Sequence, residues 1–470
     1  MSRLTILPGL AAFFCSSALL LAAEIDRTKP PVTPPIPDVK LPAAEEFQLD
    51  NGLRVVVSRD PRFPLATIRL AFLAGSKYDP KDAPGLSGNV ADLLNQGTTS
   101  RSASQIAIAS ADLGGQIAAN SSEDVLTVAG SCLSENTAAF LGLLADVAQN
   151  ASFPDDEVQL EKQNRLQILR GERAQADYLG REALSAALYG DHPYSHIGPT
   201  EESIAQLDKK SLENFRDTYL VPNNAYLILV GRLPSASEVK KIVAAQFGKW
   251  QKKDVPDYHP PAIPANHKQL LLVDRPGSVQ ANIFSAHLAP NYSSPDYFPL
   301  AVGNMILGGG ANSRLFNDIR EKRGFAYDAH SITHPLQETG SVSAVTEVRN
   351  EVVEPAMQAL NGDLTAMSKE NVSAVELSES KNSYAGRFIL RLERQAAVAD
   401  QLETIQTQNL PKDFLQMYTT HVRSVEPDQI RATGKYWDPD DATVVVVGDA
   451  SKIEKSLEKY GSVQLVKPTR

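Results

Sequence analysis

One stretch of the chain occurs twice, and this duplication constrains the fold more than any other feature. Tyr219–Gly231 and Tyr436–Gly448 each contain a proline followed by two Asn or Asp residues, a turn signal, and then an apolar β-rich run that stops at glycine. The copies start 217 residues apart. A Ser-Arg pair after a glycine-containing turn also recurs, at Gly97–Arg101 and Gly308–Arg314, with its arginines 213 residues apart. We therefore predict one module of about 210 residues used twice, a period too long for a solenoid.

The predicted elements follow the same order in both halves. Alternating apolar residues and turn signals indicate strands, and proline and glycine bracket the helices. The expected elements are a hairpin over 47–57 around Asp50-Asn51-Gly52, a strand Thr67–Ala74, a helix between Pro84 and Gly97, helices Asn136–Gln149 and Asp155–Arg173, strands Gln269–Val273 and Gln280–Ala286, and a helix Tyr297–Leu307. Each module is therefore expected to be α+β, with helices layered on a mainly antiparallel sheet.

Proline clusters suggest where the modules begin and end. Six prolines between Pro30 and Pro42 favour an extended, semi-rigid tether. A second cluster, Pro256–Pro264, lies near the middle of the chain. The expected divisions are a signal peptide at 1–23, a proline-rich tether at 24–44, a first module at 45–252, a linker at 253–267 and a second module at 268–467.

The N-terminal stretch has the pattern of an export signal. Arg3 precedes the largely apolar Leu4–Leu21, and two alanines then precede the first acidic residue. We therefore expect an exported protein, periplasmic or extracellular. An uncleaved signal would leave it tethered to a membrane, although the stretch is near the short limit for a span. A lipoprotein attached through Cys15 fits less well, because the residues before this cysteine lack the usual leucine and small side chains.

Composition excludes several classes of protein. The 42% hydrophobic and 22% charged residues are typical of a globular chain. A net charge of −10 without a basic cluster argues against nucleic-acid binding. Two cysteines, Cys15 and Cys132, are too few for a disulfide scaffold or a thiolate zinc site.

Several short motifs, taken in order, resemble the pitrilysin/insulinase superfamily of zinc peptidases, and within it the mitochondrial processing peptidase-like proteins. The resemblance extends from about Phe47 to Val466 and implies two α/β modules of the predicted size. Its pieces are Leu49-Asp-Asn-Gly52-Leu, the helix from Gly85-Leu86 to Gly97-Thr98, Tyr189-Gly-Asp-His-Pro193-Tyr, the two Pro-x-x-Ala strands, and Gly308-Gly-Gly-Ala-Asn-Ser-Arg-Leu315 through Arg320 to Tyr327.

The resemblance implies an inverted zinc motif, His-x-x-Glu-His, on the helix before Gly97. In that motif two imidazoles four residues apart bind zinc, and the glutamate polarises the metal-bound water. The matching positions here are Gly88, Ala91 and Asp92, so both histidines and the glutamate are missing. We expect the first module to be intact in structure but catalytically empty, with no metal or cofactor bound by this chain.

Neither a further zinc ligand nor a catalytic nucleophile has a clear match in the sequence. The family places a further glutamate ligand on the helix Asp155–Arg173, where Glu161 and Glu172 flank the expected region. Ser87-Gly88 lacks a nucleophile elbow, and Cys132 has no base nearby in sequence.

Two histidine pairs have a spacing of four residues. Pro193 interrupts any helix between His192 and His196, so these side chains do not share a helical face. His330 and His334 lie on a predicted strand without an acid in a ligand pattern. Ordinary hydrogen-bonding or surface roles are favoured for all four.

The second module retains a pair with possible chemistry. Arg320 lies in the last turn of a predicted helix Ser313–Lys322, and Tyr327 lies on the following strand. Their spacing resembles the family's substrate-binding Arg and Tyr in an Arg-x-x-x-Gly-x-x-Tyr setting. A guanidinium can bind peptide carbonyls, and a phenol can stabilise an oxyanion. The structural alternative is a dipole-complementing arginine and a half-buried tyrosine. Gly308, Gly309 and Gly310 suit close approach to an extended peptide better than a phosphate loop.

Two function classes follow. One is a non-catalytic subunit that supplies Arg320 and Tyr327 in trans to a zinc-bearing paralogue in a heterodimer or higher heteromer, with peptide substrates. The other is a structural or peptide-binding scaffold of the same fold. The retained pair favours the first class, and an enzyme active on its own comes third.

Overall fold

The computed structural model describes residues 37–39 and 44–467. The predicted signal peptide at 1–23 and most of the predicted tether lie outside the described residues. Among the helices of this described part, none is both long and apolar enough to span a bilayer.

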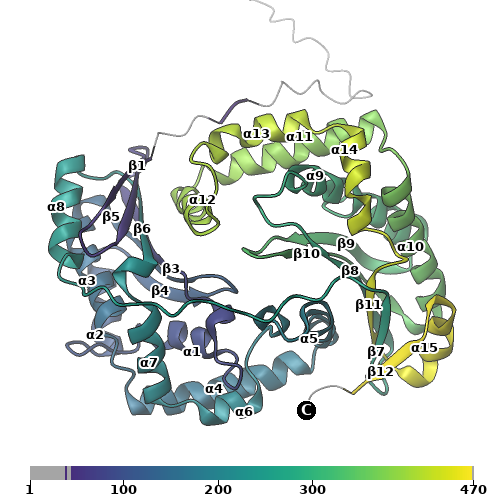
Figure 1. Cartoon of the computed structure of the whole chain (residues 1–470), viewed down its shortest axis with the longest axis horizontal. Coiled ribbons are helices and arrows are strands. Elements are labelled where there is room, and N and C mark those ends of the chain that lie inside the picture. The colour runs from purple at the N-terminus through teal and green to yellow at the C-terminus, as the bar shows by residue number, and fades with distance from the viewer. Residues whose placement is uncertain (1–36, 40–43, 468–470) are drawn as a thin grey trace, which may run out of the picture. The chain divides into compact units, whose positions relative to one another are not determined.

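The first half of the chain forms a sheet with helices around it (Figure 1). Its predicted hairpin is confirmed, and the strand predicted at Thr67–Ala74 lies two residues earlier, at Leu65–Phe72. The strands are β1 (Glu45–Gln48), β2 (Arg54–Arg59), β3 (Leu65–Phe72), β4 (Gln116–Ser121), β5 (Leu126–Leu133) and β6 (Ala225–Gly231), and the helices are α1 (Leu86–Leu93), α2 (Ala103–Asp112), α3 (Thr137–Asn150), α4 (Asp155–Arg173), α5 (Ala176–Tyr189), α6 (Glu201–Gln206), α7 (Lys209–Tyr219) and α8 (Ala236–Phe247).

The second half repeats this arrangement. Residues 251–268 connect the halves without a helix or strand. The strands are β7 (Gln269–Asp274), β8 (Gln280–Ala289), β9 (Ala326–His334), β10 (Gly340–Arg349), β11 (Thr443–Gly448) and β12 (Val463–Val466), and the helices are α9 (Tyr297–Leu307), the π-helix η5 (Phe316–Lys322), α10 (Val353–Lys369), α11 (Ala374–Arg391), α12 (Gln395–Thr407), α13 (Phe414–Ser424), α14 (Pro427–Ala432) and α15 (Ala450–Leu457).

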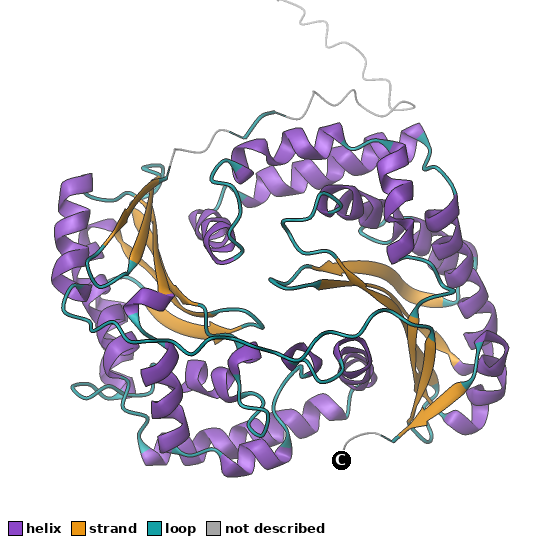
Figure 2. Ribbon diagram, viewed as in Figure 1, coloured by secondary structure: helices purple, strands orange, loops and turns teal. Residues whose placement is uncertain are grey.

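Five strands of each sheet occupy equivalent places, whereas the edge strands differ, because β1 is antiparallel to β2 and β12 is parallel to β7. Within the described residues each sheet has six strands, in the orders β1-β2-β6-β3-β5-β4 and β12-β7-β11-β8-β10-β9. The duplicated stretches form β6 and β11, which each lie between one parallel and one antiparallel neighbour. Every residue of β6 is buried, which explains its continuous apolar run. The sheets are mixed but mainly antiparallel, with helices packed on them (Figure 2), so the predicted α+β fold of two similar modules is confirmed.

One predicted helix is shorter than expected. The helix after Pro84 ends at Leu93 rather than just before Gly97. The chain leaves the helix there because Gly97 and Thr98 form β-bridges with Ser102 and Ala151. Residues 94–96 form an irregular turn in place of the last predicted helical turn.

Each sheet receives one helix from the other half of the sequence. Helix α5 packs on β7, β8 and β11, and α12 packs on β3 and β6. On α12, Glu403 and Asp400 pair with Arg69 of β3 at 2.6 and 2.7 Å. The sequence-based bounds of the two modules stay a prediction, because this exchange joins the halves into one packing unit.

The packing of α5 on the sheet of the second half can be tested at Gly180. A Cβ at this position would lie 2.1 Å from Cε2 of Phe284 on β8, so Gly180→Ala should lower the free energy of unfolding by about 1–3 kcal/mol. Gly171→Ala on α4 is the matched control, because no atom lies within 4 Å of its added Cβ, and it should stabilise by up to about 1 kcal/mol. Urea unfolding of both variants is the measurement. Equal effects would show that α5 does not pack tightly on β8.

Candidate functional site

A half-buried carboxylate lies beside the start of helix α1. Asp79 accepts hydrogen bonds from the backbone amides of Gly85, at 2.7 Å, and Ser87, at 2.8 Å. Gly85 takes a left-handed conformation with φ of 85°, which favours glycine. Asp79 therefore satisfies amide groups that the start of a helix leaves without intrahelical partners.

The three positions of the inverted zinc motif lie on α1. Gly88 and Asp92 are four residues apart and share a helical face. A Cβ at Gly88 would meet no atom within 4 Å, so the position has room for a larger side chain. Ala91 is buried, with 2% of its surface exposed. Asp92 alone of the three carries a polar side chain.

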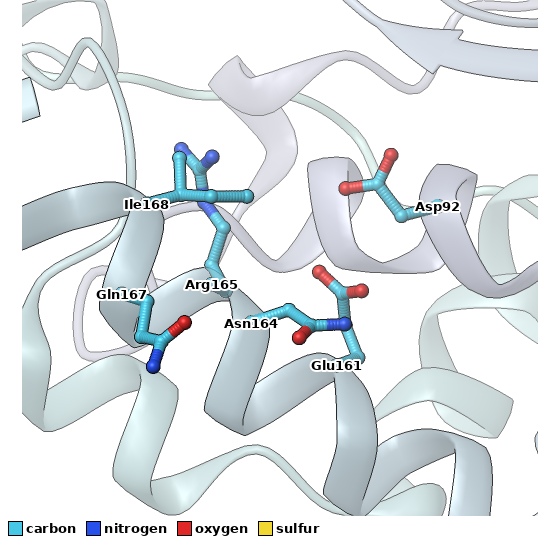
Figure 3. Close-up of a pocket in the computed structure, with 6 residues that line it drawn as sticks. All are labelled: Asp92, Glu161, Asn164, Arg165, Gln167 and Ile168. Atoms are coloured by element: carbon cyan, nitrogen blue, oxygen red, sulfur yellow. The ribbon is translucent and has the colours of Figure 1, made fainter. Parts of the chain in front are cut away.

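Asp92 faces α4 across a pocket of about 420 Å³ (Figure 3). The Glu161 carboxylate extends from α4 toward α1, the Asp92 carboxylate lies in the same space between the two helices, and Arg165 lies on α4 next to them. The remaining lining residues are Asn164, Gln167 and Ile168. The pocket therefore lies at the place that the inverted motif would occupy.

The carboxylates of this pocket influence each other. Partial burial raises the pKa of Asp92, and the positive charge of Arg165 opposes this. Burial and the negative charge of Asp92 raise the pKa of Glu161. Arg165 also contacts Glu172, with 3.6 Å between Nη2 and Oε2. Of the two glutamates that the sequence left open, only Glu161 lines the pocket.

The residues present do not fit a zinc ion. Two of the three motif positions have no donor atom, and Asp92 with Glu161 supplies only two carboxylates, whereas catalytic zinc sites use three protein ligands. Across residues 37–39 and 44–467, no three His, Cys, Asp or Glu side chains gather in a way that could hold a metal ion.

The histidine pairs remain apart from this pocket. His192 is fully buried, whereas His196 is exposed. His330 and His334 bond to different carboxylates, those of Asp328 at 2.7 Å and Glu123 at 3.4 Å.

Arg320 and Tyr327 lie in contact with each other. The Arg320 guanidinium carbon lies 4.9 Å from the Tyr327 ring centre and 4.5 Å from that of Phe316. Cation–π attraction favours both positions. Gly324, with φ of 63°, donates its amide to the Arg320 carbonyl and ends η5. The predicted placement of Arg320 in a last helical turn is confirmed, although the turn is a π-helix.

A β-bulge places the Tyr327 side chain in solvent. Ala326 pairs with Val348, but Ala329 pairs with Thr346, so β9 has one extra residue next to Tyr327. Bulges redirect side chains in this way. Tyr327 is 85% exposed, which does not match the half-buried strand tyrosine of the structural alternative.

The three glycines follow α9 and border β9. A Cβ at Gly308 would lie 2.2 Å from the backbone nitrogen of Ser331, so this glycine permits close contact with β9. The Gly309 carbonyl accepts a hydrogen bond from Arg387 at 2.9 Å, and Gly310 lies near the same guanidinium. Their contact with a peptide stays a prediction.

Comparisons with known proteins now identify the family. Residues 54–198 match the family described as insulinase (peptidase family M16), and residues 206–384 match its companion, the peptidase M16 inactive domain. The chain belongs to the insulinase family, M16. Positions 88, 91 and 92 lie in the first match, and Arg320 and Tyr327 lie in the inactive-domain match.

Two relatives in sequence and one in structure are similar to most of this chain. An uncharacterized zinc protease of Bacillus subtilis is 24% identical over 74% of this chain and 84% of its own length. A Mycobacterium leprae protein of the same description is 27% identical over 73% of this chain and 78% of its own length. A crystal structure described as a peptidase M16 inactive domain from Pseudomonas fluorescens superposes with a TM-score of 0.80 and 26% identity, covering 86% of this chain and 97% of that one.

The stability of the folded chain should depend on pH through Asp79. Burial raises its pKa to about 7, from 3.8, even though the amides of Ser87 and Gly85 favour the charged form. Because the folded state then holds a proton that the unfolded state releases, stability should fall as pH rises from about 4 to about 7, by up to ~1.4 kcal/mol per pH unit. Asp79→Asn should remove this component. Chemical unfolding at several pH values would contradict the assignment if the two proteins changed in parallel.

Proposed function

We propose that this chain is a catalytically incomplete subunit of an exported zinc-peptidase heteromer. It supplies Arg320 and Tyr327 to a zinc-bearing paralogue, which provides the metal and the general base. The observation that carries the proposal is the combination of an Arg320–Tyr327 pair in the second half, with Tyr327 exposed and Arg320 partly exposed, and an inverted-motif helix that lacks the ligands.

The chemistry of the pair supports a role in binding and catalysis. Arg320 keeps fixed donors for peptide carbonyls, and its stacking between two rings reduces the side-chain freedom that binding would remove. Tyr327 carries a hydroxyl that can donate to an oxyanion in the transition state. An 85% exposed tyrosine contributes little to packing, so a structural role does not account for its position.

The first test uses the purified chain alone. It should bind no stoichiometric zinc by elemental analysis and should not hydrolyse peptides, because two of the three motif positions carry no ligand atom. About one zinc per chain, together with peptidase activity, would overturn the proposal. Loss of that zinc on changing His192 or His330 would show which histidine pair held it.

The second test concerns the partner and the compartment. Co-expression with a paralogue of similar length that keeps His-x-x-Glu-His should give one complex on size exclusion, with peptidase activity above that of the paralogue alone. Separate elution at micromolar concentration without a gain in activity would favour the scaffold function. Cell fractionation with the full N-terminus should place the chain outside the cytoplasm, either free or held by an uncleaved signal.

A further inference from the structure

A buried lysine anchors a hairpin of the second half to the first half. Lys77, which directly precedes the segment leading to α1, is 3% exposed. Its Nζ lies 3.1 Å from Asp124 Oδ1 and 3.8 Å from Glu338 Oε1, and it also hydrogen-bonds to Gln337. Glu338 and Gln337 belong to the turn between β9 and β10. A buried ammonium is stable only with such partners.

His192 adds a second bond to the same turn, and its ring tautomer follows from its contacts. The side chain is fully buried. Nδ1 accepts the backbone N–H of Tyr194 at 3.2 Å, so Nδ1 carries no proton. Nε2 must then carry the ring proton, and it lies 3.2 Å from Glu338 Oε2. One ring nitrogen thus caps a short helical turn while the other holds Glu338.

Asp124 and Tyr258 complete the cluster. Asp124 accepts the hydroxyl of Tyr194 and, at 2.8 Å, the backbone N–H of Gln337. Tyr258, from the segment that joins the two halves, lies with its hydroxyl 3.4 Å from His192 Nε2 and its ring centre 5.0 Å from Lys77 Nζ. Five separate segments of the chain therefore meet at one polar cluster, in which Lys77, Asp124 and His192 are buried and Glu338 reaches the surface.

We propose that Lys77, Asp124, His192 and Glu338 form a clasp that positions the β9–β10 turn against the segment leading to α1, and that this clasp opens as one unit. The exchanged helices would keep the halves together while it is open. Lys77, Asp124 and His192 are buried, so removing one of them, or the Glu338 carboxylate that His192 Nε2 faces, weakens contacts that water does not readily replace, which costs more than the loss of an exposed ion pair. The existence of the clasp does not depend on the proposed function.

The hydrogen exchange of the Gln337 backbone N–H reports directly on opening of the clasp, because this N–H donates to Asp124. Hydrogen–deuterium exchange of full-length protein, read on fragments that cover 335–339, is the measurement. Glu338→Ala should accelerate exchange there at least tenfold, while fragments from β3 and α12 keep their wild-type rates. Glu347→Ala, a similar change at an exposed glutamate of β10, is the matched control and should leave 335–339 unchanged. Wild-type exchange in Glu338→Ala would overturn the proposal.

Two replacements of His192 separate its two bonds. Asn can imitate Nδ1 and keep the cap on Tyr194, but it is too short to reach Glu338, whereas Gln can donate to Glu338 but does not reproduce the cap. His192→Asn should therefore speed exchange at 335–339 at least tenfold, and His192→Gln should change it less than threefold. Equal acceleration would mean that the His192–Glu338 bond does not hold the turn. Because these readouts need no partner or substrate, an inactive complex with the expected exchange pattern would contradict only the proposed function.

Discussion

Tyr327→Phe is expected to reduce the turnover of a reconstituted complex by about 10²–10³-fold while leaving KM near the wild-type value. Loss of one oxyanion donor has this size of effect, about 3–4 kcal/mol. The phenol acts mainly in the transition state, so substrate binding should change little. Stability should also change little, because the side chain is 85% exposed and the Tyr327 hydroxyl can be removed without opening a buried space. Steady-state kinetics on the complex are the measurement.

Arg320 and its neighbour Arg323 provide the comparison. Arg320→Ala should raise KM and lower turnover, because the guanidinium holds the peptide before and during reaction. Arg323→Ala removes an equal charge from the end of the same π-helix, where Arg323 pairs with Asp318 instead, and should keep near-wild-type kinetics. Near-wild-type values for both Tyr327→Phe and Arg320→Ala would reject the proposed roles. A large loss of melting temperature in either variant would assign that residue to the structure instead.

Elements with clear local signals were predicted well from the sequence. Helices α4 and α9 have the predicted bounds, Asp155–Arg173 and Tyr297–Leu307. Proline directly precedes α4, and glycine directly follows α9. Each helix therefore has one boundary that can be recognised from the sequence alone. The duplicated stretches similarly predicted two strands, because a continuous apolar run is typical of a buried strand.

Contacts between distant segments could not be predicted in this way. An amphipathic pattern shows that one face of α5 is buried, but it does not say that Phe284 of the other half covers Gly180. Lysine is almost never fully buried, so composition favours an exposed Lys77, and only the fold shows its partners. The bulge at Tyr327 depends on the pairing of β9 with β10, which leaves no local signal. The contact between Phe316 and Arg320 could have been predicted, because the two residues are four positions apart on one predicted helix.

Restoring the inverted motif should produce a zinc site in this chain. The variant Gly88→His, Ala91→Glu, Asp92→His places two imidazoles on the face of α1 that borders the pocket, where Gly88 has no atom within 4 Å of an added Cβ. Glu161 already lines this pocket and would supply a carboxylate, giving the two-histidine, one-glutamate ligand set of a catalytic zinc site. We expect the variant to retain about one zinc per chain after dialysis, against less than a tenth for the natural chain.

The assignment of Glu161 decides how this result is interpreted. Adding Glu161→Gln to the triple variant should abolish most zinc retention, because the amide is a weaker ligand than a carboxylate, while Glu172→Gln should not, because Glu172 lies beside Arg165 and does not line the pocket. Elemental analysis and thermal melts of all three variants are the measurements. If the triple variant folds but retains no zinc, the spacing of α1 and α4 has itself departed from zinc geometry. The helix packing, and not only the missing ligands, would then keep zinc from this site.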